Sequence, residues 1–277
     1  MMKRVAEGCR DDDVAAHYDE LDSIYRMIWE ENLHHGLWED GVKSRSEAAA
    51  RMTEFIGDRL HLREGQRVWD VGCGFGRMMS DLVDRFGVKA GGVTISRKQW
   101  EQAASGADVR LGDWLQNDLP DGEFDAVMAV ESLEHMSDPK TAVSEMLRVT
   151  KPGGRVVLAC WMEGDRLRAW EKRLLIDPIR RDGMLGGMAD EGRIREYLDE
   201  AGAEQLVVDD LSRQVERTWS DCLKRALRLA LSDRGMQEAL GSDWRRSVRM
   251  GLTLNRIWAA YVLGAIRYQV FSARRPG

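Results

Sequence analysis

The chain has 277 residues, of which 43% are hydrophobic and 32% charged, and its formal net charge is −6. This length and composition predict a globular protein with one large domain, or one domain with an appended cap, able to bury a real core. The acidic balance speaks against a nucleic-acid-binding protein, because such proteins usually present a basic face to their partner.

The cysteines and the first residues of the sequence indicate in which cellular compartment the protein is expected. Cys9, Cys73, Cys160 and Cys222 lie far apart and lack metal-ligand spacing, which argues against a metal site and against a disulfide framework. The first residues have no apolar signal segment, and no run of 18 apolar residues is present to span a bilayer. We therefore expect a cytoplasmic protein in a reducing environment, without a membrane partner.

Two helices are predicted before the first strand. In residues 14–38, apolar side chains recur at three- and four-residue steps, which is the spacing of one helix face, and Gly36 then breaks the run. Residues 44–60 form the second predicted helix, with Ser44 or Ser46 as its N-cap.

From Gln66 onward, short β-branched runs alternate with helical segments. The predicted strands are 67–71, 90–94, 108–111, 124–130 and 155–160, and the predicted helices are 77–86, 97–105 and 139–150. Such alternation builds a parallel sheet with helices on both faces. The rhythm breaks at a predicted insertion and then resumes, with the following segments: insertion 161–190, helix 191–201, strand 204–208, mostly helical stretch 213–265 and closing strand 266–273.

A glycine-rich turn follows the first predicted strand and opens a helix. Its pattern is Asp70-x-Gly72-x-Gly74-x-Gly76. A ligand lying across a strand end needs close approach of the backbone, and glycine permits both this approach and positive φ angles. The helix that follows points its N-terminal amides at an anionic group. Dinucleotide-binding dehydrogenases have a related turn with the spacing Gly-x-Gly-x-x-Gly, so the spacing here favours a methyltransferase instead.

Almost the whole chain resembles the class I S-adenosylmethionine-dependent methyltransferases, within them the group of tocopherol methyltransferases, cyclopropane fatty acid synthases and actinobacterial natural-product methyltransferases. Besides the glycine-rich turn, four stretches carry the likeness: 17–38, 92–99, 111–114 and 130–136. The resemblance implies an α/β, Rossmann-like fold with a seven-stranded, mostly parallel sheet, helices on both faces and a mainly helical cap. The expected division is an N-terminal helical lid 1–45, a cofactor-binding core 46–161 continued at 191–212, a cap insertion 162–190, a helical cap 213–265, and a closing strand with the tail 266–277.

The resemblance also implies S-adenosylmethionine as the cofactor, covered by the N-terminal segment. In the family, aromatic residues of this segment lie near the methyl group, which implies cofactor contacts for Tyr18 and Tyr25 and a substrate-side place for His35 and Trp38. Tyr18 and Tyr25 also lie on the apolar stripe of the first predicted helix, so packing in the core is the alternative. In the glycine-rich turn, the implied cofactor-binding residues are Asp70, Gly72, Gly74 and Gly76.

The ribose and adenine sides of the cofactor have their own candidates. Many methyltransferases hold the ribose hydroxyls with an acidic residue after the second strand, and this chain has none there. The resembling group has a Thr and a Gln instead, which implies Thr94 and Gln99, since an amide both donates and accepts hydrogen bonds. After the third strand, the family uses an Asp for the adenine amino group and the next backbone for the ring, which implies Asp113 and Trp114.

Glu131, Glu134 and His135 follow the fourth predicted strand, at the edge where open parallel sheets bind ligands. An imidazole has an ordinary pKa of about 6.5, so His135 suits a general base for an oxygen, nitrogen or activated aromatic carbon acceptor. With an alkene acceptor, Glu131 or Glu134 would instead stabilise a carbocation and take a proton. Structural roles are the alternative for all three, among them a helix-start carboxylate for Glu134.

The insertion and its border supply the remaining substrate candidates. Arg180 and Arg181 belong to a basic cluster that could face an anionic acceptor such as a carboxylate or diphosphate; a solvated helix face is the alternative. Only a diphosphate acceptor would bring Mg²⁺, and no dedicated metal cluster is predicted. Trp161 lies near the predicted top of the sheet and suits an aromatic or terpenoid pocket.

Together these residues predict methyl transfer to a small, largely apolar natural-product acceptor of secondary metabolism. Carbon is the favoured acceptor atom, because two of the segments resemble groups that contain carbon methylators; N- or O-methylation is the alternative. A second class of function is a cyclase or scaffold that keeps the fold and cofactor without methylating. The expected partner is the small-molecule acceptor, with no nucleic acid, and a homo-oligomer is left open.

Overall fold

The computed structural model describes residues 34–103, 108–186, 188–232 and 244–277. Most of the helix predicted at 14–38 lies outside these ranges. Its end is not helical: residues 34–38 run as an irregular segment. The backbone N–H groups of Leu37 and Trp38 donate to the carbonyls of Ala48 and Gln214 instead of closing helical turns. That part of the helix prediction is therefore wrong, because the segment is bonded to distant elements.

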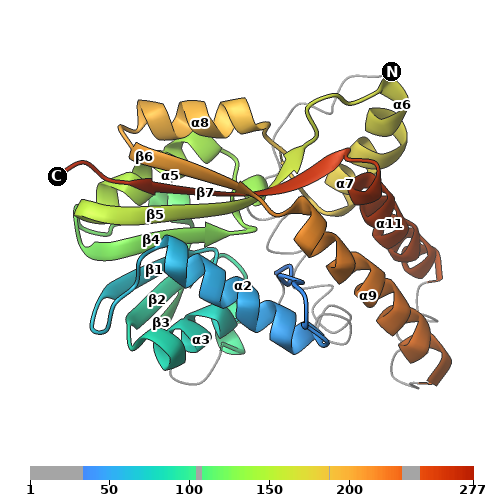
Figure 1. Ribbon diagram of the computed structural model, residues 1–277, viewed down its shortest axis with the longest axis horizontal. Helices are drawn as coiled ribbons and strands as arrows, with labels where there is room; N and C mark the ends of the chain where they lie inside the picture. The colour runs from blue at the N-terminus through green and yellow to red at the C-terminus, as the bar shows by residue number, and fades with distance from the viewer. Residues whose placement is uncertain (1–33, 104–107, 187, 233–243) are drawn as a thin grey trace.

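The centre of the molecule is a seven-stranded sheet with the order β3-β2-β1-β4-β5-β7-β6 (Figure 1). All neighbours from β3 to β5 are parallel, and β7 is antiparallel to both β5 and β6. The strands are β1 Arg67–Val71, β2 Lys89–Thr94, β3 Asp108–Leu111, β4 Phe124–Val130, β5 Thr150–Glu163, β6 Glu204–Asp210 and β7 Ile266–Arg274. The predicted Rossmann-like, mostly parallel sheet is confirmed.

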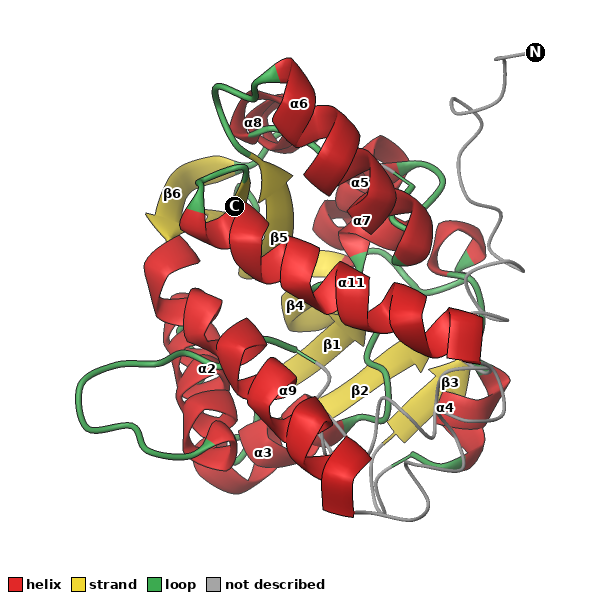
Figure 2. Ribbon diagram, turned by 90° about the vertical axis from the view of Figure 1, so that its right-hand side faces the viewer, coloured by secondary structure: helices red, strands yellow, loops and turns green. Residues whose placement is uncertain are grey.

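Helices cover both faces of the sheet, because alternate residues of the central strands point to opposite sides. On β4, Ala126 and Met128 pack with one hydrophobic core, and Val127 and Ala129 pack with the other. The first core receives α2 and α3, and the second receives α5 and α8 (Figures 1 and 2). These helices and the short α4 are α2 Arg45–Arg59, α3 Arg77–Phe86, α4 Arg97–Glu101, α5 Pro139–Val149 and α8 Glu191–Glu200.

The cap is mainly helical and lies beyond one end of the sheet (Figure 1). Its long helices α9 and α11 pack against each other, and α11 also contacts α7. The insertion forms one continuous helix with a π-helical turn in its middle, a local irregularity that is frequent at functional sites. The cap helices are α6 Ala169–Glu171, the π-helical turn Lys172–Ile176, α7 Asp177–Asp182, α9 Ser212–Ser232 and α11 Trp244–Val262. No helix in the described ranges is long and apolar enough to cross a membrane.

Element boundaries mostly match the expectations, and the exceptions have causes. Ser44 is the N-cap of α2, since its side chain accepts from the N–H of Glu47. Strand β5 extends past the predicted end at residue 160, because β7 pairs with it as far as Glu163, and it begins earlier than predicted, at Thr150, which pairs with Phe124. Helix α4 ends at Glu101, four residues earlier than predicted.

Candidate active site

The glycine-rich turn connects β1 to α3 at the carboxyl edge of the sheet. Gly72, Gly74 and Gly76 have φ angles of +81°, +57° and +75°, in the left-handed region that favours glycine. A Cβ atom on Gly72 would lie 2.4 Å from the Cβ of Ser132, whereas one on Gly74 would meet nothing within 4 Å. The turn is therefore packed against the end of β4 on one side and leaves room for a ligand on the other.

Asp70 precedes this turn and has a carboxylate oxygen without a protein partner. Its side chain is buried, and Oδ1 has no hydrogen-bond partner among the residues that the structure describes. Burial raises the pKa of Asp70 to about 7. A cation close to Asp70 would lower this pKa again, and the cofactor implied by the sequence carries both an ammonium and a sulfonium group. A buried carboxylate with an oxygen available as an acceptor therefore fits that cofactor.

The end of β2 forms a small polar network. The hydroxyl of Thr94 donates to Oε1 of Gln99 at 2.7 Å, and the N–H of Gln99 donates to the hydroxyl of Ser96 at 3.1 Å. The hydrogen bond to Oε1 fixes the orientation of the Gln99 amide, and its nitrogen can only donate. Thr94 holds the amide of Gln99 in this orientation.

Asp113 and Trp114 begin a 3₁₀ turn, Trp114–Gln116, after β3. Oδ1 of Asp113 accepts from the N–H of Leu115, and Oδ2 accepts from the side-chain amide of Gln116. A carboxylate has about four acceptor positions, so two remain for another donor. The indole of Trp114 is buried in the core and donates to the carbonyl of Ala142 at 3.1 Å. Only the backbone of Trp114 can therefore face a ligand.

At the end of β4, Glu131 accepts hydrogen bonds from four donors. Its Oε1 accepts from the N–H of His35 at 2.7 Å and from the hydroxyl of Tyr268 at 2.9 Å. Its Oε2 accepts from Nδ1 of His35 at 2.9 Å and from the indole of Trp161 at 3.1 Å. Glu131 itself has a φ of +53°, so the backbone adopts a strained conformation to bring the carboxylate to these donors.

These contacts fix the charge of Glu131 and the tautomer of His35. Burial raises the pKa of Glu131, but the interactions with His35 outweigh burial and lower this pKa to about 2. The indole of Trp219 lies 2.6 Å from Nε2 of His35. An indole N–H can only donate, so Nε2 accepts and the ring proton of His35 lies on Nδ1, facing Glu131. The carboxylate is therefore a fixed anion at neutral pH.

Glu134 lies three residues further along and has the opposite environment. Its Oε1 accepts from the N–H of Trp161, while Oε2 is buried without a partner in the described part of the chain. This carboxyl borders a small cavity lined otherwise by apolar side chains, among them Leu133, Cys160 and Ile194. Burial raises the pKa of Glu134 to about 8. Glu134 is therefore mostly a neutral acid at pH 7.

His135 follows Glu134 and contacts the insertion. Its Nδ1 lies 3.1 Å from the carbonyl of Met184, which comes directly after the end of α7. A carbonyl can only accept, so Nδ1 carries a proton and Nε2 is the basic nitrogen of the neutral ring. Met184 has a φ of +52°, an uncommon value for a side-chain-bearing residue. The insertion thus orients the imidazole of His135.

The remaining predicted substrate residues differ in their contacts and in how close they lie to the cluster around Glu131. Trp161 is half-buried and stacks edge-on against His35 at a centroid distance of 5.0 Å. Trp38 is buried and donates to the hydroxyl of Thr218 on α9, so it anchors its segment to the cap. Arg180 donates to the carbonyl of Gly186 and lies 3.7 Å from Glu163.

Arg181 is not brought to this cluster. Arg181 is 72% exposed and pairs with its neighbour Asp182. Tyr18 and Tyr25 lie outside the described residues. In the described ranges, no three His, Cys, Asp or Glu side chains gather as metal ligands.

Sequence patterns did not reveal three residues of the cluster around Glu131. Trp219 on α9, Tyr261 on α11 and Tyr268 on β7 all lie within hydrogen-bond distance of His35 or Glu131. All three are buried and occur in segments predicted only as helix or closing strand. Each of the three lies more than 130 residues along the chain from the residue that it contacts, so no local spacing could have linked them.

Comparisons with known proteins identify the family. Residues 7–242 match the family model described as mycolic acid cyclopropane synthetase. The chain is 31% identical to 27-O-demethylrifamycin SV methyltransferase of Amycolatopsis mediterranei (strain S699), with 95% of this chain and 97% of that protein covered. It is 28% identical to a chloroplastic tocopherol O-methyltransferase of Arabidopsis thaliana, with 95% of this chain and 82% of that protein covered.

A solved structure supports the same assignment. The [4+2]-cyclase SpnF superposes with a TM-score of 0.78 and 25% sequence identity, and 97% of each chain is covered. The predicted resemblance, fold and cofactor are confirmed. The chain belongs to the mycolic acid cyclopropane synthetase family and is an S-adenosylmethionine-dependent methyltransferase.

Proposed function

We propose that this enzyme transfers a methyl group to a hydroxyl oxygen of a small, largely apolar natural-product acceptor, with His135 as the general base. The observation that carries this proposal is the contact between Nδ1 of His135 and the carbonyl of Met184. It leaves Nε2 as the basic nitrogen at the carboxyl end of β4. The segments of the sequence favoured carbon as the acceptor atom, but the two relatives compared above are named for O-methylation, and we therefore propose oxygen.

The glycine-rich turn, Asp70, Gln99 and Asp113 would hold the cofactor. They lie at the end of β1 or in the segments that follow the adjacent strands β1, β2 and β3, so they share the carboxyl edge of the sheet. Bound S-adenosylmethionine supplies an electrophilic methyl group on its sulfonium, and alignment provides much of the rate of such a displacement. The protein's remaining tasks are to orient the acceptor and to take its proton.

His135 is suited to take this proton because of its orientation, and because imidazole is a side chain that commonly serves as a general base. The carbonyl of Met184 fixes the ring, as second partners commonly do for functional imidazoles. Nε2 would accept the hydroxyl proton while the oxygen becomes methylated. General bases contribute about 10²–10⁴-fold to such rates.

The neighbouring carboxyls are less suited to this role. Both oxygens of Glu131 already accept two hydrogen bonds each, so we assign Glu131 to positioning of His35 and Trp161. Glu134 is mostly protonated at pH 7 and buried beside an apolar cavity. The arginines offer little support for an anionic acceptor, since Arg180 pairs with Glu163 and Arg181 with Asp182.

The test is single-turnover methyl transfer by the His135→Asn variant. We expect the rate with bound cofactor to fall at least about 100-fold, with little change in the affinity for S-adenosylhomocysteine. His61→Asn is the matched control, because His61 is exposed and its φ of +54° suits asparagine. An unchanged rate in His135→Asn would remove His135 from the chemical step.

Isotope labelling decides the acceptor atom and the class of function. With ¹³C-methyl-labelled cofactor, the proposal predicts product methyl resonances in the range of methyl ethers. A carbon-bound or nitrogen-bound label supports the corresponding alternative. Conversion of an acceptor without transfer of label supports a cyclase, the function for which the structural neighbour SpnF is named.

A further inference from the structure

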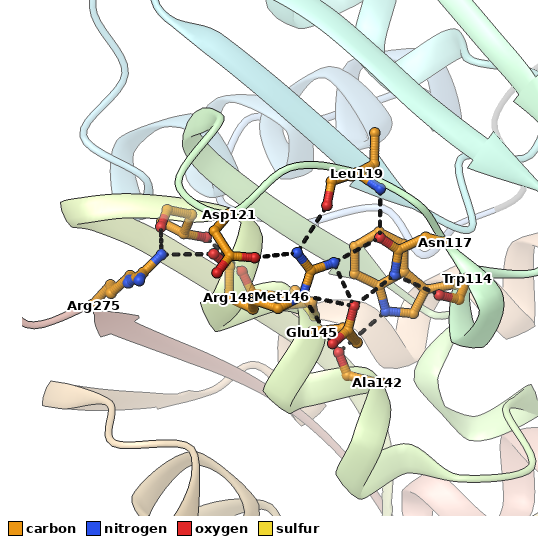
Figure 3. Close-up of polar contacts among 10 residues, drawn as sticks. Trp114, Asn117, Leu119, Asp121, Ala142, Glu145, Met146, Arg148 and Arg275 are labelled. Atoms are coloured by element: carbon orange, nitrogen blue, oxygen red, sulfur yellow. Dashed lines mark hydrogen bonds and ion pairs between the residues drawn. The ribbon is translucent and has the colours of Figure 1, made fainter.

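We propose that Asn117, Glu145 and Arg148, which we call the Arg148 network, position the turn 112–117 so that Asp113 reads the adenine amino group of the cofactor. This inference rests on the proposed cofactor role of Asp113 and is independent of the acceptor and of His135. Figure 3 shows the network between α5 and the turn that follows β3. Nearly every hydrogen-bonding group of these three side chains is used, and this leaves the turn little freedom to move.

The guanidinium of Arg148 uses all five of its N–H donors (Figure 3). Nε donates to the carboxylate of Glu145, and Nη2 donates to Glu145 and to Oδ1 of Asn117. Nη1 donates to the carbonyl of Leu119 and to the carboxylate of Asp121. A planar fork with every donor engaged has one orientation, so Arg148 fixes the relative positions of its partners.

Asn117 connects this fork to the turn. Its Nδ2 donates to the carbonyl of Trp114 at 2.9 Å and to Glu145 at 2.9 Å. Its Oδ1 accepts from Arg148 at 3.0 Å and from the N–H of Leu119 at 3.2 Å. The carboxamide therefore makes all four of its hydrogen bonds, and a slip of the turn would break several of them together.

A second connection holds the same turn against α5. The indole of Trp114 donates to the carbonyl of Ala142, which lies one helical turn before Glu145 and two before Arg148. One face of α5 thus holds the side chain of Trp114 directly, and holds its carbonyl through Asn117. Since Asp113 immediately precedes Trp114, the position of its carboxylate depends on these contacts.

The electrostatics of the network distinguish it from an ordinary surface ion pair. Hydrogen bonds from Arg148 lower the pKa of Glu145, and the hydrogen bonds to Glu145 and Asp121 raise the pKa of Arg148. The side chains of Arg148 and Glu145 are only 29% and 23% exposed. Arg193 and Glu196 on α8 form a similar i,i+3 pair, but at 57% and 50% exposure and without contact to the turn. That pair is the natural control.

The experiment compares two ligands by calorimetry: S-adenosylhomocysteine and its inosine analogue, in which a carbonyl replaces the adenine amino group. The variants are Arg148→Lys, which keeps the charge but loses the fork, and Glu145→Gln, which keeps the shape but loses the charge. We expect each variant to bind S-adenosylhomocysteine about tenfold more weakly, with little loss for the analogue. The preference for adenine over hypoxanthine therefore falls about tenfold.

The ratio of the two affinities, rather than stability, decides the outcome. Arg193→Lys is expected to keep the wild-type ratio. If Arg148→Lys and Glu145→Gln weaken both ligands equally, or neither, the network is only structural and the proposal is overturned. Wild-type protein without a preference for adenine also overturns it, because Asp113 then does not read the amino group. None of these results bears on whether His135 acts as the base.

Discussion

Glu131 and Glu134 lie three residues apart at the end of β4, and their surroundings shift their pKa values in opposite directions. Both side chains are largely removed from solvent. The pKa of Glu131 is lowered to about 2, and the pKa of Glu134 is raised to about 8. The difference lies in their donors: four reach Glu131, whereas one backbone N–H reaches Glu134 and its second oxygen has no partner in the described ranges.

This contrast shows that the partners of a carboxyl, above all His35 beside Glu131, decide together with burial which carboxyl stays charged. The different pKa values also indicate different roles for the two carboxyls, which the sequence could not assign. Glu131 is a fixed anion that ties together three segments, through His35, Trp161 and Tyr268. Glu134 is a neutral acid beside the proposed base His135.

Removing the charge of Glu131 is the strongest way to test this contrast. In Glu131→Gln, an amide replaces an oxygen that accepts from His35 and Trp161, so buried donors face a donor. We expect a loss of about 3 kcal/mol in the free energy of unfolding, measured by urea denaturation at pH 7. Glu196→Gln, on the exposed pair of α8, should lose less than about 0.5 kcal/mol. Equal effects in the two variants would show that the donors around Glu131 contribute nothing special.

The Glu134→Gln variant should differ from the wild type mainly in how its free energy of unfolding depends on pH. A folded-state pKa raised from 4.5 to about 8 gives a stability contribution that is complete below pH 4.5 and is lost as the pH rises through 8. The wild type should therefore lose at least about 2 kcal/mol between pH 5 and pH 8.5 relative to Glu134→Gln. Urea denaturation at both pH values measures this difference. Parallel pH dependence in the two proteins would contradict a neutral Glu134.

The sequence was sufficient for the sheet and for the positions of residues at the strand ends. A glycine pattern after β1, or Glu131 after β4, depends only on local alternation and on the rule that ligands bind at the carboxyl edge. Thr94, Gln99 and Asp113 were assigned through the family resemblance, and the structure places them at the ends of the adjacent strands β2 and β3 or in the segments that follow these ends. These features depend on residues close together in the chain, so a single sequence is enough to predict them.

Partners from distant elements could not be predicted in this way. Tyr268 reaches Glu131 across 137 residues, and Trp219 reaches His35 across 184. The same limit explains the wrong helix at 34–38, where backbone donors are bonded to α2 and α9. Long-range hydrogen bonds decide both cases, and neither apolar periodicity nor capping residues report them.

The smallest expected effect concerns a single donor of Glu131. Tyr268→Phe removes a hydroxyl that donates to Oε1 at 2.9 Å but keeps the buried ring. We expect a loss of about 1.5 kcal/mol at pH 7, the contribution of one hydrogen bond to a charged group. Tyr197→Phe on the half-buried face of α8 is the control.

The pH dependence of the free energy of unfolding at acid pH provides a second test of the Tyr268→Phe variant. Because the folded pKa of Glu131 is depressed, its stabilisation is present above about pH 4.5 and is lost as the pH falls towards 2. With one donor fewer, the pKa of Glu131 in the folded state rises. The free energy of unfolding then depends less on the charge of Glu131, and it falls less steeply as the pH is lowered. Unfolding free energies at pH 3 and pH 6 should therefore differ less in Tyr268→Phe than in the wild type. An unchanged difference would mean that the remaining three donors hold the charge by themselves.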